Sequence, residues 1–254
     1  MRVLGLVFLL IILSVQIFAQ DSFGNRTTYF SAGLVQIKES ANYGLVFRGP
    51  ALNIGMNWNI LHGNQIFFYE FQFELAAPMS KGVVGEHTNI KPVEFAYAWQ
   101  IHSGQFDLKI GPALKMEYKL EYYSDLQSGY NYWLTSYTMG LSAFALVPVK
   151  KSTVRLRFFN SLAGFASKNE IYDDPYFFDP GFGEIMKDFH SDFKFVTLGS
   201  FNNTSFEVRF KISDSSRMTV SYVFDYCVHM KSPDVKYLNQ SIRLNFNSKK
   251  RNEK

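Results

Sequence analysis

Apolar and polar residues alternate along most of this chain, with aromatic or aliphatic side chains on every second position between Phe67 and Phe246. Successive side chains of a β-strand point to opposite faces, so an alternation with a period of two predicts strands. The clearest segment opposes Phe206, Val208, Phe210 and Ile212 to Ser205, Glu207, Arg209 and Lys211. No helical period fits this segment, and the pattern therefore predicts an all-β protein.

The alternation recurs in ten segments, the first near Tyr29–Ile37, and the connections between them alternate in length. Short turns are expected at His62–Asn64, His102–Gly104, Lys150–Ser152 and Asp214–Ser216, and longer connections at Glu39–Gly49, Ala76–Ile90, Glu121–Asn131, Lys168–Asn202 and Lys231–Lys236. Short turns on one rim and longer loops on the other are typical of outer-membrane barrels. The sequence predicts an up-and-down antiparallel transmembrane β-barrel of about ten strands. Twelve strands is the alternative count. The segment Phe193–Ser200 could be an extra strand, but we interpret it as a hairpin arm above the membrane.

A soluble barrel of the lipocalin type shows the same alternation with its apolar face inside. Here the apolar face is rich in bulky aromatic residues, which a ten-stranded lumen could hardly contain. Aromatic residues also gather near strand ends, where a membrane-interface girdle would lie: Tyr29, Trp58, Trp99, Tyr118, Tyr132 and Trp133. We therefore expect the apolar face to contact lipid. A soluble barrel that binds an apolar ligand is the alternative.

The N-terminus has the layout of a secretory signal peptide. Arg2 precedes an apolar run from Val3 to Val15, and the small residue Ala19 follows. The run is shorter than the roughly 20 apolar residues that a spanning helix needs. We predict a signal peptide at residues 1–19, an outer-membrane barrel domain at residues 20–254, and no helical membrane protein.

Composition narrows the function classes only slightly. The chain has 26 Lys and Arg residues against 22 Asp and Glu residues, and part of the excess lies in the basic tail Lys249–Lys254. A short basic tail predicts a solvated end rather than nucleic-acid binding. The single cysteine, Cys227, excludes an internal disulfide and a cysteine-based zinc site.

The last predicted strand carries the piece of sequence most like a motif, namely Gln240 followed by Leu244 and Phe246 two residues apart. It is similar to the insertion signal of small Gram-negative outer-membrane β-barrel proteins, and the chain resembles the porin-like barrels of the Bacteroidota. It differs in having Ser241 where the family usually has Gly, and eight residues after Phe246. The resemblance implies outer-membrane lipid and the barrel-assembly machinery as partners.

If the apolar face contacts lipid, the charged residues between these positions line the lumen. They are Glu70, Glu74, Glu94, Asp107, Lys109, Lys115, Glu117, Arg155, Arg157, Glu207, Arg209, Lys211, Asp225 and Arg243. Acids are expected to predominate on the third and fourth strands, and bases on the seventh, eighth and last. Such groups could form an ion-paired interior that fills the lumen, or line a narrow water-filled pore for small solutes. The expected function is a non-enzymatic one, as a narrow porin-like channel or a structural or surface-interaction protein.

The long connection from Lys168 to Asn202 combines acids and aromatics, and its candidate functional residues are Asp173, Asp174, Asp179 and His190. Their spacing lacks the pattern of a calcium loop, so we predict neither a metal nor a cofactor. An outer-membrane hydrolase using His190 and loop acids is the alternative function. We expect instead that this loop caps the barrel, folds into it, or binds a surface partner.

Overall fold

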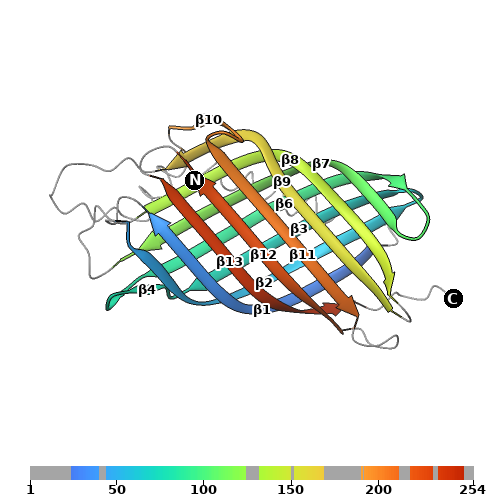
Figure 1. Ribbon diagram of the computed structural model, residues 1–254, viewed down its shortest axis with the longest axis horizontal. Helices are drawn as coiled ribbons and strands as arrows, with labels where there is room; N and C mark the ends of the chain where they lie inside the picture. Colours follow the sequence, from blue (N-terminus) through green and yellow to red (C-terminus); the bar gives the residue numbers. More distant parts are fainter. Residues whose placement is uncertain are drawn as a thin grey trace, which may run out of the picture.

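The computed structural model describes residues 24–39, 44–123, 132–149, 152–168, 190, 192–211, 218–230 and 234–248. These residues form an antiparallel barrel with ten long strands (Figure 1). The strands are β1 (Gly24–Glu39), β2 (Val46–His62), β3 (Gln65–Ala76), β6 (Glu86–His102), β7 (Asp107–Tyr122), β8 (Tyr132–Val149), β9 (Ser152–Lys168), β11 (Phe201–Lys211), β12 (Met218–His229) and β13 (Val235–Asn247). The barrel is closed because β1 pairs with both β2 and β13. The prediction of a ten-stranded up-and-down barrel is confirmed. Within the described ranges no helix is long and apolar enough to cross a membrane.

Three short strands lie at the rim where the longer connections are, the extracellular rim in barrels of this type. β4 (Met79–Ser80) and β5 (Val83–Val84) form a small hairpin that extends the sheet beside β2. β10 (Lys194–Thr197) pairs with the end of β9, above the start of β11 (Figure 1). The segment Phe193–Ser200 therefore adds no spanning strand.

The longer connections are shorter than the sequence predicted. β1 continues to Glu39, β2 begins at Val46, and β6 begins at Glu86 rather than near Val93. The expected loop Ala76–Ile90 is thus mostly strand. At the ends of β1 and β2 the alternation is masked in the sequence because inward residues such as Ile37 and Phe47 are apolar.

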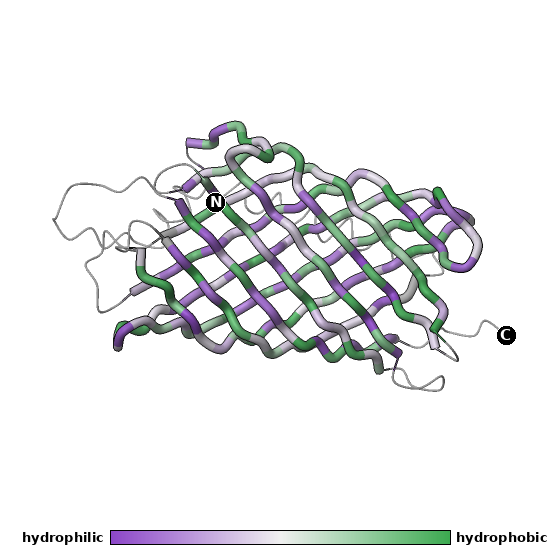
Figure 2. The backbone as a smooth tube through the Cα atoms, viewed as in Figure 1, coloured by the Kyte–Doolittle hydropathy of each residue, from purple (hydrophilic) through white to green (hydrophobic). Residues whose placement is uncertain are grey.

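Hydrophobic and hydrophilic residues alternate along each strand of the barrel (Figure 2). Leu34 is 68% exposed and Ile242 61% exposed on the outer surface, whereas Glu70 is 0% and Arg243 1% exposed. An apolar outer wall around a polar interior suits a barrel surrounded by lipid and is the reverse of a soluble barrel. The prediction that the apolar face points outward is confirmed, and the protein is an outer-membrane β-barrel.

Tyr29 corrects one part of this prediction. We expected it in the aromatic girdle, but its side chain lies fully buried inside the barrel. Gly55 on the neighbouring strand makes room for it, since a Cβ there would lie 2.4 Å from the Tyr29 hydroxyl oxygen. Trp99 and Trp58, by contrast, do point outward.

The lumen also contains two apolar clusters that the sequence analysis did not anticipate. The extracellular cluster is Val35, Ile37, Phe47, Ala51, Tyr123, Leu134, Ala166, Val196, Phe201, Cys227, Val235 and Tyr237. The second cluster, toward the short turns, is Ile66, Phe68, Ala96, Ala98, Ala113, Phe144 and Phe159. The inner face of the barrel is therefore polar in the middle and apolar toward parts of both ends.

Candidate functional site

The middle of the lumen is organised around the carboxylate of Glu70 on β3. Its Oε1 accepts a hydrogen bond from Arg243 Nη1 at 2.8 Å, and its Oε2 lies 3.3 Å from Arg157 Nη2. Lys91 Nζ donates to the same Oε2. The three cations come from β13, β9 and β6, so the interaction crosses the barrel. A buried carboxylate with three cationic partners offsets much of the desolvation of each charge.

Glu94 is a second acid at the same level of the lumen and lies opposite Glu70 in the β3–β6 register. Two like charges in directly opposed positions repel each other. Lys91 Nζ separates them, because it lies 3.1 Å from Glu94 Oε2 while also bonding Glu70. Arg157 Nη2 adds a second link, 3.2 Å from Glu94 Oε1.

A β-bulge explains why Lys91 can reach this layer. The register with β7 shifts between Ile90 and Val93, next to Pro92, and the register with β3 shifts at the same place. A bulge inserts one extra residue and reverses which residues face inward from that point. Lys91 and Glu94, three residues apart, therefore both point into the lumen.

Glu207 on β11 is the third acid at this level of the lumen. Its Oε1 accepts hydrogen bonds from Arg209 Nη2 at 2.8 Å and from Ser221 Oγ at 2.7 Å. Its Oε2 lies 3.9 Å from Arg243 Nη1 and 4.0 Å from Arg157 Nη1. Strands β11 and β12 are thereby joined to the network centred on Glu70.

Aromatic rings cover the two arginines that reach furthest across. The guanidinium carbon of Arg243 lies 3.7 Å from the ring centroid of Tyr29, and that of Arg157 lies 4.3 Å from the centroid of Phe68. Cation–π contacts of this kind strengthen when water is excluded. We name the set Tyr29, Phe68, Glu70, Lys91, Glu94, Arg157, Glu207 and Arg243 the central layer.

A second polar group lies between the central layer and the extracellular cluster. The carboxylate of Glu74 accepts hydrogen bonds from Tyr237 and Asn239. The imidazole of His87 lies between two acids, with Nε2 3.4 Å from Glu74 Oε1 and Nδ1 3.7 Å from Glu121 Oε1. Each of these five side chains is buried.

Glu117 on β7 is the centre of the neighbouring ion pairs. Lys119 Nζ lies 2.8 Å from its Oε2, and Lys115 Nζ lies 3.4 Å from its Oε1. Lys115 Nζ also donates to Asn203 Oδ1 and Ser205 Oγ on β11, across the lumen. Side-chain bonds therefore join β7 to β11 across the lumen nearer its extracellular end, as ion pairs join strands across its middle.

The predicted lumen charges divide into three groups in the structure. Glu70, Glu74, Glu94, Lys109, Lys115, Glu117, Arg157, Glu207, Arg209 and Arg243 are buried within the barrel. Asp107, Arg155 and Asp225 are half-buried, and Lys211 is exposed. Sequence reasoning missed the lumen residues Tyr29, His87, Lys91, Lys119, Glu121 and Tyr237. Acids still predominate on β3 and β6, but Lys91 on β6 adds a base that the sequence analysis did not include, and it pairs with two of these acids.

The loop candidates lie elsewhere. Asp173, Asp174 and Asp179 are outside the described residues. His190 Nε2 lies 3.3 Å from the hydroxyl oxygen of Tyr118, and nearby Phe193 stacks on Tyr137 at 5.0 Å between ring centroids. Tyr118 belongs to the apolar face of β7, so His190 lies against the outer wall rather than in the lumen. Among the described residues no group of three or more His, Cys, Asp or Glu side chains is arranged to hold a metal ion.

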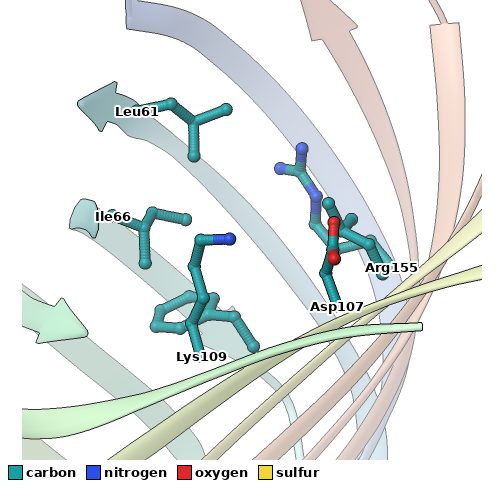
Figure 3. A pocket seen from close by; sticks show the side chains of 7 residues that line it. Leu61, Ile66, Asp107, Lys109 and Arg155 are labelled. Atoms are coloured by element: carbon teal, nitrogen blue, oxygen red, sulfur yellow. The ribbon is translucent and has the colours of Figure 1, made fainter. Parts of the chain in front are cut away.

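A recess opens at the opposite end of the lumen, beside the short turns (Figure 3). Its walls come from the ends of β2, β3, β7, β8 and β9, and its cavity volume is about 30 Å³, within a wider hollow of about 340 Å³ that includes space open to solvent. The lining residues are Leu61, Ile66, Asp107, Lys109, Phe144, Leu146 and Arg155. Of the predicted lumen charges, the recess therefore gathers one acid and two bases.

Comparison with known proteins gives structural likenesses only. No protein-family model and no curated protein matches this chain. The outer membrane protease OmpT from Escherichia coli has a TM-score of 0.49 at 9% identity, covering 88% of this chain and 97% of its own. The translocator domain of the autotransporter NalP from Neisseria meningitidis has a TM-score of 0.41 at 8% identity, covering 95% of both chains. The COG4313 outer membrane channel from Pseudomonas putida F1 has a TM-score of 0.39 at 7% identity, covering 91% of this chain and 97% of its own. These are a protease, a translocator and a channel, and at such scores none of their activities transfers to this chain.

Proposed function

We propose that this protein is a non-enzymatic outer-membrane barrel with a closed lumen, which acts as a structural or surface-interaction protein rather than as an open channel. The observation that carries the proposal is the central layer, whose side chains cross the lumen and are almost inaccessible to water. Glu70 is 0% exposed, although it lies in the middle of a barrel that would be water-filled in an open porin. Side chains lining an aqueous pore would keep part of their surface in contact with water.

The charge pattern of the central layer supports the same proposal. Each carboxylate lies within 4 Å of at least two cations or polar donors, at least one of them on another strand, and both arginines of the layer also contact aromatic rings. A buried charge is stable in a low-dielectric interior only when it is paired and hydrogen-bonded. A set of mutually bonded charges suits a packed interior better than a path for mobile ions.

The extracellular cluster adds a second barrier. The rings of Phe47 and Tyr123 are in contact, with centroids 4.5 Å apart, and Phe201 and Tyr237 are buried beside them in the same cluster. Apolar side chains packed at native density leave little room for water. A solute entering from outside the cell would have to displace this cluster before it reached the central layer.

Planar-bilayer conductance of the refolded, full-length protein tests the proposal. We expect insertion, shown by heat-modifiable gel migration, without steady conductance. A double variant, Phe47→Ala with Arg157→Ala, removes one group from each barrier and is the positive control that should conduct. Steady channels in the wild type would overturn the closed-lumen proposal and favour the narrow porin-like channel.

Enzyme assays test the non-enzymatic part separately. We expect no hydrolysis of lipid or peptide substrates by the folded barrel. Hydrolysis that is abolished in His190→Ala would establish the outer-membrane hydrolase instead.

The remaining parts of the proposal concern biogenesis. We propose that the signal peptide is removed after Ala19, and that barrel-assembly machinery of a Bacteroidota-type cell recognises β13. Leu244 and Phe246 both point outward on that strand, where an assembly factor could contact them. Intact mass of the purified protein should give Gln20 as its first residue, and Phe246→Ala should lower the amount of folded barrel in the membrane.

A further inference from the structure

Two cations that line the recess lack, among the described residues, the carboxylate partners that other lumen cations have. Lys109 is only 8% exposed, yet its Nζ makes no hydrogen bond or ion pair with any described residue. Arg155, half-buried on β9, likewise has no ion pair among the described residues. By contrast, Lys91, Arg157 and Arg243 each lie within 4 Å of a carboxylate. The recess therefore differs in kind from the central layer.

The neighbours of Arg155 make the absence of a described counter-ion energetically more unfavourable. In the β9–β11 register Arg155 lies directly opposite Arg209, another cation. Arg209 already uses its Nε and Nη2 atoms on Glu207 Oε1, at 3.0 and 2.8 Å. Two like charges opposed across strands repel each other. An anion in the recess would offset this repulsion.

Asp107 is the one acid among the described residues that line the recess (Figure 3). It forms no ion pair within 4 Å with either Lys109 or Arg155. One carboxylate against two cations gives the described lining residues a net charge of +1. The recess therefore offers at least one cationic position that no described protein group satisfies.

The remaining lining residues are apolar, and they determine which class of anion the recess can bind. Leu61, Ile66, Phe144 and Leu146 supply aliphatic and aromatic surface beside the two cations. Phe144 lies directly opposite Lys109 in the β7–β8 register, and Leu146 opposite Arg155 in the β8–β9 register. Each cation thus has an apolar neighbour on β8.

From this arrangement we infer that the recess binds a small organic anion, a carboxylate with a short hydrocarbon chain, entering from the side of the short turns. Lys109 and Arg155 bond the carboxylate, and the hydrocarbon chain lies against Phe144 and Leu146. Arginine and lysine form their strongest hydrogen bonds with ionised oxygen acceptors. The site does not depend on whether the lumen conducts, because it is open to solvent at its own end.

Calorimetric titration of the detergent-solubilised, full-length protein with hexanoate tests the inference. Acetate keeps the charge without the chain, hexanol keeps the chain without the charge, and inorganic phosphate supplies an anion without apolar surface. We expect saturable hexanoate binding, at least about tenfold tighter than that of the other three probes, since both the charged and the apolar contacts contribute. Phosphate binding as tightly as hexanoate, or an absence of saturable hexanoate binding, would overturn the inference.

Matched variants locate the site. Lys109→Gln and Arg155→Gln should each weaken hexanoate binding by about tenfold or more, since each removes a charged hydrogen bond. Lys236→Gln and Arg48→Gln change the net charge equally at exposed positions of the other rim and should leave affinity within about twofold. Equal losses in both pairs would mean nonspecific attraction and would refute the site.

A measurement on the wild type covers the case in which a variant fails to fold. Hexanoate should slow reductive methylation of Lys109, followed by mass spectrometry, by at least about fivefold relative to methylation of Lys236. A rate at Lys109 that hexanoate leaves unchanged would contradict the inference, whatever the variants do.

Discussion

Buried cations are ion-paired in one half of the lumen and lack a described counter-ion in the other. From the central layer to the extracellular rim, cations such as Lys91 and Arg243 bond carboxylates from other strands, and apolar rings lie above them. At the other end, Lys109 and Arg155 line a recess without any described ion pair. One barrel can therefore use buried charges in two ways. Paired charges join strands across the lumen and close it, whereas cations without a described counter-ion leave a place for a ligand.

Glu70→Gln should have the largest effect, because it leaves Lys91, Arg157 and Arg243 buried around a neutral amide. Removing one partner from a buried ion pair costs about 3–5 kcal/mol, since the remaining charges stay desolvated. Urea unfolding of the barrel in lipid vesicles, followed by tryptophan fluorescence, measures the loss. Glu86→Gln, at an exposed position on β6, is the control and should cost less than about 0.5 kcal/mol. A loss below about 1 kcal/mol for Glu70→Gln would show that the central layer is hydrated rather than packed.

Phe47→Ala tests the packing of the extracellular cluster. Phe47 is fully buried in the extracellular cluster against Tyr123, so its removal leaves a cavity and should cost about 3–4 kcal/mol. The same unfolding assay applies, with Phe30→Ala as the matched change on the lipid-facing side of β1. Equal costs for the two variants would mean that the cluster is no better packed than the outer wall.

The barrel architecture could be predicted from sequence because it depends on a repeated local signal. Each strand of this barrel has one lipid-facing side, so apolar residues recur at every second position over many residues. Connection lengths then gave the strand count without any long-range information. Lipid contact is the same for all strands, and no knowledge of which residues meet was needed.

The site was less predictable because it depends on contacts across the lumen and on departures from the period of two. The bulge near Pro92 reversed the inward set on β6 and hid Lys91, the residue that separates Glu70 from Glu94. Tyr29 looked like a girdle residue because its neighbours on β1 alternate weakly. Its inward position depends on the small residue Gly55 on another strand, which no local pattern reveals.

Gly55→Ala tests that dependence and should have an intermediate effect. The added methyl group would lie 2.4 Å from the Tyr29 hydroxyl oxygen, 2.5 Å from its ring carbon Cζ and 2.4 Å from the backbone oxygen of Phe71 on β3, so the ring, Arg243 above it and the β2–β3 pairing must shift. Overpacking of this kind costs about 1–3 kcal/mol. In a double-mutant cycle with Tyr29→Leu, the two losses should add only in part, because the second change removes the ring that clashes but not the Phe71 backbone oxygen. Fully additive losses would mean that the strain lies in the contact with the β3 backbone at Phe71 instead.

Lys109→Met should have the smallest effect and gives the sharpest contrast between the two halves of the lumen. Lys109 is nearly buried without a described counter-ion, so replacing its ammonium group by a thioether removes a desolvated charge while keeping most of the stem in place. We expect unfolding free energy to change by less than about 1 kcal/mol, with any change toward greater stability. The matched substitution Lys91→Met removes a cation shared by Glu70 and Glu94 and should cost about 3–5 kcal/mol. If both variants lost stability equally, Lys109 would have to be as well paired as Lys91, and the distinction between closure and binding would fail at that residue.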